Sequence, residues 1–198
     1  MDATESVDDD VRHLVDEGRV DDATALILER HGAEIMGVLV RLAGGEALAA
    51  EAYSLYCERV WRALPSFRFA AAVRTWAYAL ARRSLADARR HRRRAPHVVL
   101  APGSRLPEVV QQARSSTRPH LRTTHKDRLQ AIRAELDEDE QLLLVLRLDR
   151  AMPWDAIARV LHDDVELEGA ELRRATAALR KRYERLKARL STRFREPL

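Results

Sequence analysis

Apolar side chains recur at helical spacing on both sides of a proline-rich interval, and this pattern limits the fold more than any other feature of the chain. In its clearest stretch, residues 52–64, they follow one another at steps of one and three residues, which places them on one face of an α-helix. These positions are Ala52, Tyr53, Tyr56, Cys57, Val60, Trp61 and Leu64. No stretch has the strict alternation of a half-buried β-strand. We therefore expect an all-α protein.

Glycines and prolines divide the chain into two small helical domains. We expect the first domain over residues 11–95 and the second over 127–198. The interval 96–126 contains four prolines and weak periodicity, so it is expected to be a flexible linker with a short helix near 109–114. Residues 1–10 hold five acidic residues and no lysine or arginine, and are expected to form a disordered start.

The helices of the first domain can be placed by their breakers. A helical pattern opens at Val11–Leu28 and continues at the same spacing until Gly44-Gly45 interrupt it. The next helix is expected over 46–62, where Pro65 ends it. A further helix begins near Val73 and runs into a block of arginines.

Composition excludes several classes of protein. Hydrophobic residues make up 46% of the chain, enough to form a core, and Cys57 is the single cysteine, which excludes an internal disulfide and a multi-cysteine zinc site. Cys57 lies on the apolar stripe and is expected to be buried rather than nucleophilic. The seven histidines form no i,i+4 pair, and no glycine-rich phosphate loop is present. We expect no enzyme activity, cofactor, metal site or small-molecule substrate.

No apolar run approaches the length of a membrane span, and the acidic start is unlike a signal peptide. We therefore expect a soluble, cytoplasmic protein without membrane insertion.

Positive charge is concentrated in two blocks. Residues 82–94 hold seven arginines against one acid, Asp87, and residues 171–195 hold ten basic residues against Glu171 and Glu184. Two separated basic helices suit a polyanion that is contacted at two places. The same pattern also fits two solvated, helix-stabilising surfaces, and composition alone does not choose between them.

The second domain has the order of elements of a helix-turn-helix. A short helix over Trp154–Leu161 is followed by a polar turn, His162–Asp164, and by a long basic helix. The inward seam of that helix is expected to be Leu172, Leu179, Tyr183, Leu186 and Leu190. Basic side chains mostly off the seam could contact DNA in the major groove: they are Arg173, Arg174, Arg180, Lys181, Arg182 and Arg185. A coiled-coil or packing helix would have a similar seam.

Aromatic residues lie just before the first arginine block. Phe67 and Phe69 fall in a predicted loop and are expected to be exposed, where they could stack on unpaired bases. Trp76, on the following helix, is expected to be a core residue.

Several strings in the two domains are those of a known family. They are Glu29-Arg30-His31-Gly32 followed by Ile35, Arg59-Val60-Trp61-Arg62-Ala63-Leu64-Pro65-Ser66-Phe67-Arg68, Val73-Arg74-Thr75-Trp76-Ala77-Tyr78-Ala79-Leu80-Ala81-Arg82, Asp87-Ala88-Arg89-Arg90-His91-Arg92-Arg93-Arg94 and Met152-Pro153-Trp154-Asp155-Ala156-Ile157-Ala158-Arg159-Val160-Leu161. Over roughly residues 11–95 and 127–190, the chain resembles a bacterial RNA polymerase sigma factor of the extracytoplasmic-function type. The resemblance implies a sigma region 2-like bundle and a sigma region 4-like helix-turn-helix.

The resemblance also implies roles for particular residues. The helix over 46–62 would bind the coiled coil of the polymerase's largest subunit through Glu51, Ser54, Leu55, Glu58 and Arg59. The loop 66–72 would capture a flipped base, and minus-ten DNA would be bound by Phe67, Arg68, Phe69, Arg74, Trp76, Arg82, Arg83, Arg89 and Arg90. The final helix would read the minus-thirty-five element, and the apolar helix 142–148 would dock on the flap of the second-largest subunit. The implied partners are core RNA polymerase and promoter DNA, with an anti-sigma factor as a further candidate.

Three departures from the family keep alternatives open. Residues 48–55 read Leu-Ala-Ala-Glu-Ala-Tyr-Ser-Leu where the family has an acid-rich run, and residues 70–72 are all alanine. The turn before the reading helix is longer than expected, so the reading motif starts either at Leu179, which keeps the family's apolar spacing and is preferred, or at Leu172. The leading hypothesis is a promoter-specificity subunit. The alternatives are a sigma-fold adaptor or decoy that binds a protein partner, and a helix-turn-helix repressor.

Overall fold

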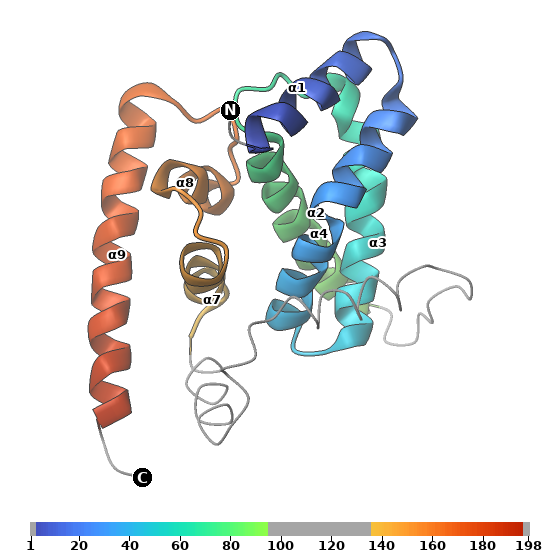
Figure 1. Ribbon diagram of the computed structural model, residues 1–198. Helices are drawn as coiled ribbons and strands as arrows, with labels where there is room; N and C mark the ends of the chain where they lie inside the picture. Colours follow the sequence, from blue (N-terminus) through green and yellow to red (C-terminus); the bar gives the residue numbers. More distant parts are fainter. Residues whose placement is uncertain (1–2, 95–135, 196–198) are drawn as a thin grey trace. The chain divides into compact units, whose positions relative to one another are not determined.

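The computed structural model describes residues 3–94 and 136–195, which form two compact units divided between Thr117 and Arg118 (Figure 1). The described residues form helices and no strand, so the expected all-α fold is confirmed for them. The predicted linker, with its short helix near 109–114, lies outside the described residues. None of the described helices combines the length and the apolar character needed to cross a membrane.

The first unit is built on α2 (Val20–Ala43), α3 (Glu46–Ala63) and α4 (Val73–Arg94), which run alongside one another (Figure 1). A 3-10 turn, η1 (Leu64–Ser66), follows α3. The core between these helices is formed by fully or almost fully buried side chains from all three, among them Ile27, Ile35, Met36, Leu39, Tyr56, Val60, Val73, Tyr78 and Leu80. Burial of such side chains is the main source of stability for a bundle of this size.

The acidic start was expected to be disordered, and this expectation is wrong. Helix α1 spans Ala3–Asp16 and packs on α2. Val11 is fully buried, while Asp9 and Asp10 face solvent. Asp9 and Asp10 therefore lie on the outer face of an amphipathic helix whose apolar face contacts the bundle.

A second difference concerns the helix expected to open at Val11–Leu28, which is broken at Gly18. Gly18 adopts φ +74° and donates its N–H to Val15 O, while Arg19 N donates to Leu14 O. These two bonds form a Schellman motif, which ends α1 and redirects the chain into α2. The predicted break at Gly44 is confirmed, because this residue closes α2 in the left-handed conformation with φ +71°.

The second unit begins with α7 (Glu138–Leu144), which continues into a π-helical turn, η3 (Val145–Asp149). Asp137 caps α7 by accepting from Glu140 N at 2.7 Å, and the Glu140 carboxylate accepts in return from Asp137 N at 3.4 Å. This capping box fixes the start of a helix that lies over the core of the unit. The most deeply buried side chains there are Leu143, Leu146, Met152, Ile157 and Leu186.

The expected helix pair at the end of the chain is present as α8 (Trp154–His162) and α9 (Gly169–Arg195). Asp163, in the left-handed conformation, ends α8. The connection then covers residues 163–168, which is longer than the predicted turn. Residues 169–178, which precede the preferred start of the reading motif at Leu179, already belong to α9.

Candidate nucleic-acid interface

An arginine surface covers the C-terminal half of α4. Exposed side chains on it are Arg83, Arg90, Arg92, Arg93 and Arg94. Arg89 is half-buried and donates from Nη2 to the carbonyl of Leu42 at 2.6 Å. Arg89 thus closes the last turn of α2, and the surface available to a polyanion is formed by the other arginines of the block.

The single acid in this block, Asp87, holds two arginines. Its carboxylate pairs through one oxygen with Arg59 of α3 and through the other with Arg90 of α4. Arg59 and Asp87 are both mostly shielded from solvent. Arg59, predicted to bind polymerase, is therefore engaged between α3 and α4. Sequence reasoning counted Asp87 only as an exception to the basic run and missed this cluster.

Arg74 was predicted to support melted DNA, but it faces the interior of the unit. Its Nε lies 3.1 Å from Glu34 Oε1 on α2, and Tyr78 donates to the same carboxylate. Burial opposes the charge of Arg74, yet the hydrogen bonds and charge of Glu34 outweigh this effect and raise the pKa of Arg74. Arg74 is a structural partner of Glu34, and its contact with DNA stays a prediction.

The aromatic residues before α4 form a stack. Phe67 lies against Trp76 with ring centroids 4.6 Å apart and planes nearly parallel, and against Phe69 at 4.5 Å. Phe67 and Trp76 are 9% and 5% exposed, so the expected exposure of Phe67 is wrong and the expected burial of Trp76 is confirmed. Phe69 is half-buried. The exposed side chains of this loop are Arg68 and Ala70.

The outer face of α3 carries most of the residues predicted to bind polymerase. Ser54 and Glu58 are exposed, and Glu51 and Leu55 are half-buried. Their spacing of three and four residues places them on one side of the helix. Glu58 also pairs with Arg62 at 2.8 Å, one turn further along.

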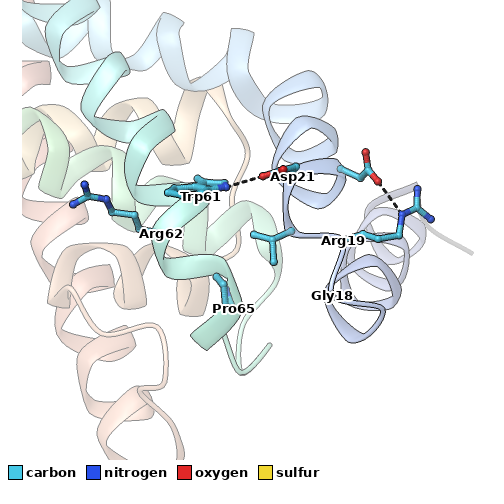
Figure 2. A pocket seen from close by; sticks show the side chains of 8 residues that line it. Gly18, Arg19, Asp21, Trp61, Arg62 and Pro65 are labelled. Carbon is cyan, nitrogen blue, oxygen red and sulfur yellow. Dashed lines mark hydrogen bonds and ion pairs between the residues drawn. The ribbon is translucent and has the colours of Figure 1, made fainter.

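Trp61 lies near the end of α3. It was expected on the buried stripe, but its side chain is 51% exposed. Figure 2 shows its ring beside an open groove between the start of α2 and the end of α3, with Pro65 on the same side. The indole Nε1 donates to Asp21 Oδ1 at 2.8 Å. This hydrogen bond, which the sequence pattern did not reveal, holds the ring at the surface.

Cys57 is half-buried on α3 beside Tyr53. Burial raises the pKa of its thiol to about 11, against the smaller, opposite effect of the hydrogen bond with Tyr53. The thiol is therefore protonated at neutral pH and is a weak nucleophile. Among the described residues, no cluster of histidine, cysteine and carboxylate side chains could hold a metal ion.

Helix α9 presents the second basic surface. The predicted DNA contacts that are exposed on this helix are Arg173, Arg174, Arg180, Lys181 and Arg185. The opposite side of the helix is buried through Ala175, Leu179, Tyr183 and Leu186. The predicted seam therefore holds at Leu179, Tyr183 and Leu186, while Leu172 and Leu190 are only half-buried.

Two basic residues of α9 are used inside the unit. Arg182 pairs with Asp137, and Arg189 Nη1 lies 2.7 Å from Glu140 Oε1. Both contacts fasten α9 to the capping box of α7. Arg182 was predicted to read DNA; the structure shows it paired with Asp137, and its contact with DNA stays a prediction.

Trp154 connects α8 with both of its neighbours in the chain. Its ring meets Tyr183 edge to face at 5.2 Å, and the guanidinium groups of Arg147 and Arg180 lie 4.7 and 6.0 Å from the ring centroid. Cation–π contacts restrict the conformations of an arginine without neutralising its charge. Trp154 thus limits where Arg180 can point.

The comparisons bear on the first unit. Residues 27–95 match the family model of sigma-70 region 2, a range that begins within α2 and includes α3 and α4. Helix α1 and the second unit lie outside the match. No match to a curated protein or to a solved structure was found. The match shows that residues 27–95 of the first unit are similar to sigma-70 region 2.

Proposed function

We propose that this chain is a bacterial sigma factor of the extracytoplasmic-function type, which binds core RNA polymerase and directs promoter recognition and transcription initiation. The observation that carries the proposal is the match of residues 27–95 to sigma-70 region 2, on a helical unit whose α4 ends in exposed arginines. The polymerase would supply the chemistry, so the chain itself needs no cofactor and performs no catalysis.

In this proposal the arginine surface of α4 holds the backbone of the opened minus-ten strand. Arg83, Arg90 and Arg92–Arg94 are exposed along one helix, and arginines placed in this way neutralise successive phosphates. Arg68, exposed in the loop before α4, is a further candidate for a phosphate contact. Phe67 supports the loop from inside through its stack on Trp76.

The minus-thirty-five element is assigned to α9, whose continuity from Gly169 bears on the register of its reading motif. In helix-turn-helix proteins the first residues of the second helix contact base edges. Arg173 and Arg174 lie in that part of α9 and are exposed, which supports the register that begins at Leu172 over the one that begins at Leu179. Arg180 and Lys181 are then assigned to phosphates further along.

Polymerase binding is assigned to the outer face of α3. It is tested by gel filtration of the purified chain with core RNA polymerase, for which co-elution is expected. The double variant E51A/E58A should reduce co-elution, while E29A, which removes an exposed acid from α2, serves as the matched control. Failure of the unchanged chain to co-elute with polymerase would contradict the proposal.

A second candidate is a sigma-fold adaptor that binds another protein, an anti-sigma factor among the possible classes, without supporting initiation. The observation that favours it is the composition of α3: Leu48, Ala49, Ala50, Ala52 and Tyr53 are buried. Glu51 is then the one charged side chain that residues 48–55 offer to a partner. The adaptor predicts no co-elution with polymerase.

A further inference from the structure

Helix α1, which the family match does not include, makes two contacts with the segment that leads into α4. Asp8 Oδ1 accepts a hydrogen bond from Val73 N at 3.1 Å, across 65 positions of sequence. The guanidinium group of Arg12 lies over the Phe69 ring at 4.8 Å. Asp8 and Arg12 are one helical turn apart and so share a face of α1. One face of α1 therefore contacts both the loop 67–72 and the first residue after it.

The contact of Asp8 replaces a local helix cap. The N–H groups in the first turn of a helix have no partner within it and are usually satisfied by a nearby side chain. No acidic residue lies in the first turn of α4. Asp8 supplies both the acceptor for Val73 N and the negative charge that favours a helix N-terminus. Consequently, the point at which the loop ends and α4 begins depends on α1.

The contact of Arg12 falls on the residue with the least favourable backbone in the loop. Phe69 has φ +55°, a region that side chains other than glycine rarely adopt. Its ring is held between the guanidinium group of Arg12 and the ring of Phe67, which itself stacks on Trp76. Such a conformation persists only where surrounding contacts fix it. One of these contacts comes from Phe67, which lies in the core of the unit, and the other comes from Arg12 on α1.

We infer that Asp8 and Arg12 are positioning residues, which hold the loop 67–72 in the conformation that accepts an unpaired base of the opened strand. The inference rests on the proposed function and deepens it, because it adds α1 to the base-selecting part of the chain. Arg68 and Ala70 are exposed on the loop. Asp8 and Arg12 touch the loop and are not assigned a contact with DNA.

The test uses the full chain bound to core RNA polymerase. The probe is a pool of single-stranded oligonucleotides with a short randomised window, and the bound fraction is sequenced. The variants are D8A and R12A, and D10A is the matched control, since Asp10 carries the same charge on the exposed side of α1. The unchanged chain should enrich particular bases within the window.

Loss of the loop conformation should lower this enrichment by about tenfold in D8A and R12A, and leave it unchanged in D10A. Binding of the unselected pool and its dependence on salt should stay the same in all variants, because the α4 arginines are untouched. D8N keeps an acceptor oxygen for Val73 N and should retain most of the enrichment; if D8A does not fold, R12A carries the test. Hydrogen exchange at Val73 should be faster in D8A than in D10A.

Equal enrichment of the same bases by D8A, R12A and the unchanged chain would overturn the inference while leaving the proposed function intact. Failure of the unchanged chain to bind polymerase would overturn the proposed function, and the role assigned to α1 would fall with it. A general loss of stability alone would reduce binding of the whole pool rather than its selectivity.

Discussion

Arg182 of α9 pairs with Asp137, the capping residue of α7, with 2.9 Å between Nη2 and Oδ1. Arg180, two positions earlier in the same basic run, points to solvent beside Trp154. Neighbouring arginines in one helix thus have different partners, because successive residues of a helix face different directions. Arg182 is expected to stabilise the fold of the second unit, and Arg180 is expected to bind a ligand.

This difference predicts opposite effects for two alanine substitutions. R182A should lower the free energy of unfolding by about 0.2–1 kcal/mol, since the pair is largely exposed, and should leave DNA affinity nearly unchanged. R180A should leave stability unchanged and weaken DNA binding, with a smaller dependence on salt. Urea denaturation and DNA titrations at two salt concentrations measure both. An equal loss of DNA affinity in the two variants would contradict the assignment.

The aromatic stack before α4 predicts a large effect of Trp76 on stability. W76A should destabilise the first unit by about 3–5 kcal/mol, because it removes a buried ring together with its contact with Phe67. W61A is the comparison: that ring is half exposed, so its loss should destabilise the unit less than W76A does. Thermal unfolding of the two variants distinguishes them. Equal melting temperatures would place Trp76 outside the core.

Close packing of α2 on α3 predicts that Gly32 cannot be enlarged without cost. A Cβ at Gly32 would collide with the hydroxyl oxygen of Tyr53, a buried residue. G32A should therefore destabilise the chain by about 1–3 kcal/mol. Y53F removes the clashing oxygen. The double variant G32A/Y53F should therefore lose less free energy of unfolding than the two single variants lose in sum. Additive effects in a double-mutant cycle would rule out this contact as the cause.

His31 predicts a loss of stability in mildly acidic solution. Burial lowers the pKa of its imidazole, with the charge of Glu34 opposing this effect and those of Arg74 and Arg30 adding to it. A histidine with a lowered pKa in the folded state binds fewer protons folded than unfolded, so stability falls as the pH drops below about 6.5.

The urea midpoint should therefore be lower near pH 5.5 than near pH 7.5, and H31Q should reduce this difference. The quantity compared is the pH dependence of each protein, so a uniform loss of stability in H31Q does not affect it. The same pH dependence in both proteins would show that other groups cause it.

The ends of most helices could be predicted because their causes are local. Gly44, Pro65 and Pro153 each prevent or redirect a helix through their own backbone chemistry, and α2, α3 and α8 end or begin beside them. The break at Gly18 was missed because the apolar spacing continues across it. There the glycine acts through a Schellman motif, which an isolated glycine in a sequence does not reveal.

The directions of individual arginines could not be predicted, because their partners are distant in sequence. Arg74 faces inward owing to Glu34, which is 40 positions away, and Arg182 owing to Asp137, which is 45 positions away. Charge counting places all arginines of a block on one surface. Packing decides which of them meet a carboxylate, and in α4 and α9 it leaves a smaller set exposed to solvent.

The central claim is tested most directly by transcription reconstituted with core RNA polymerase and genomic DNA from the cells that produce this chain. Adding the chain should give transcripts with discrete 5′ ends that core polymerase alone does not produce. A variant with Arg90, Arg92, Arg93 and Arg94 changed to alanine should still co-elute with polymerase and should lose these transcripts. The same transcripts with and without the chain, and no co-elution with polymerase, would contradict the account.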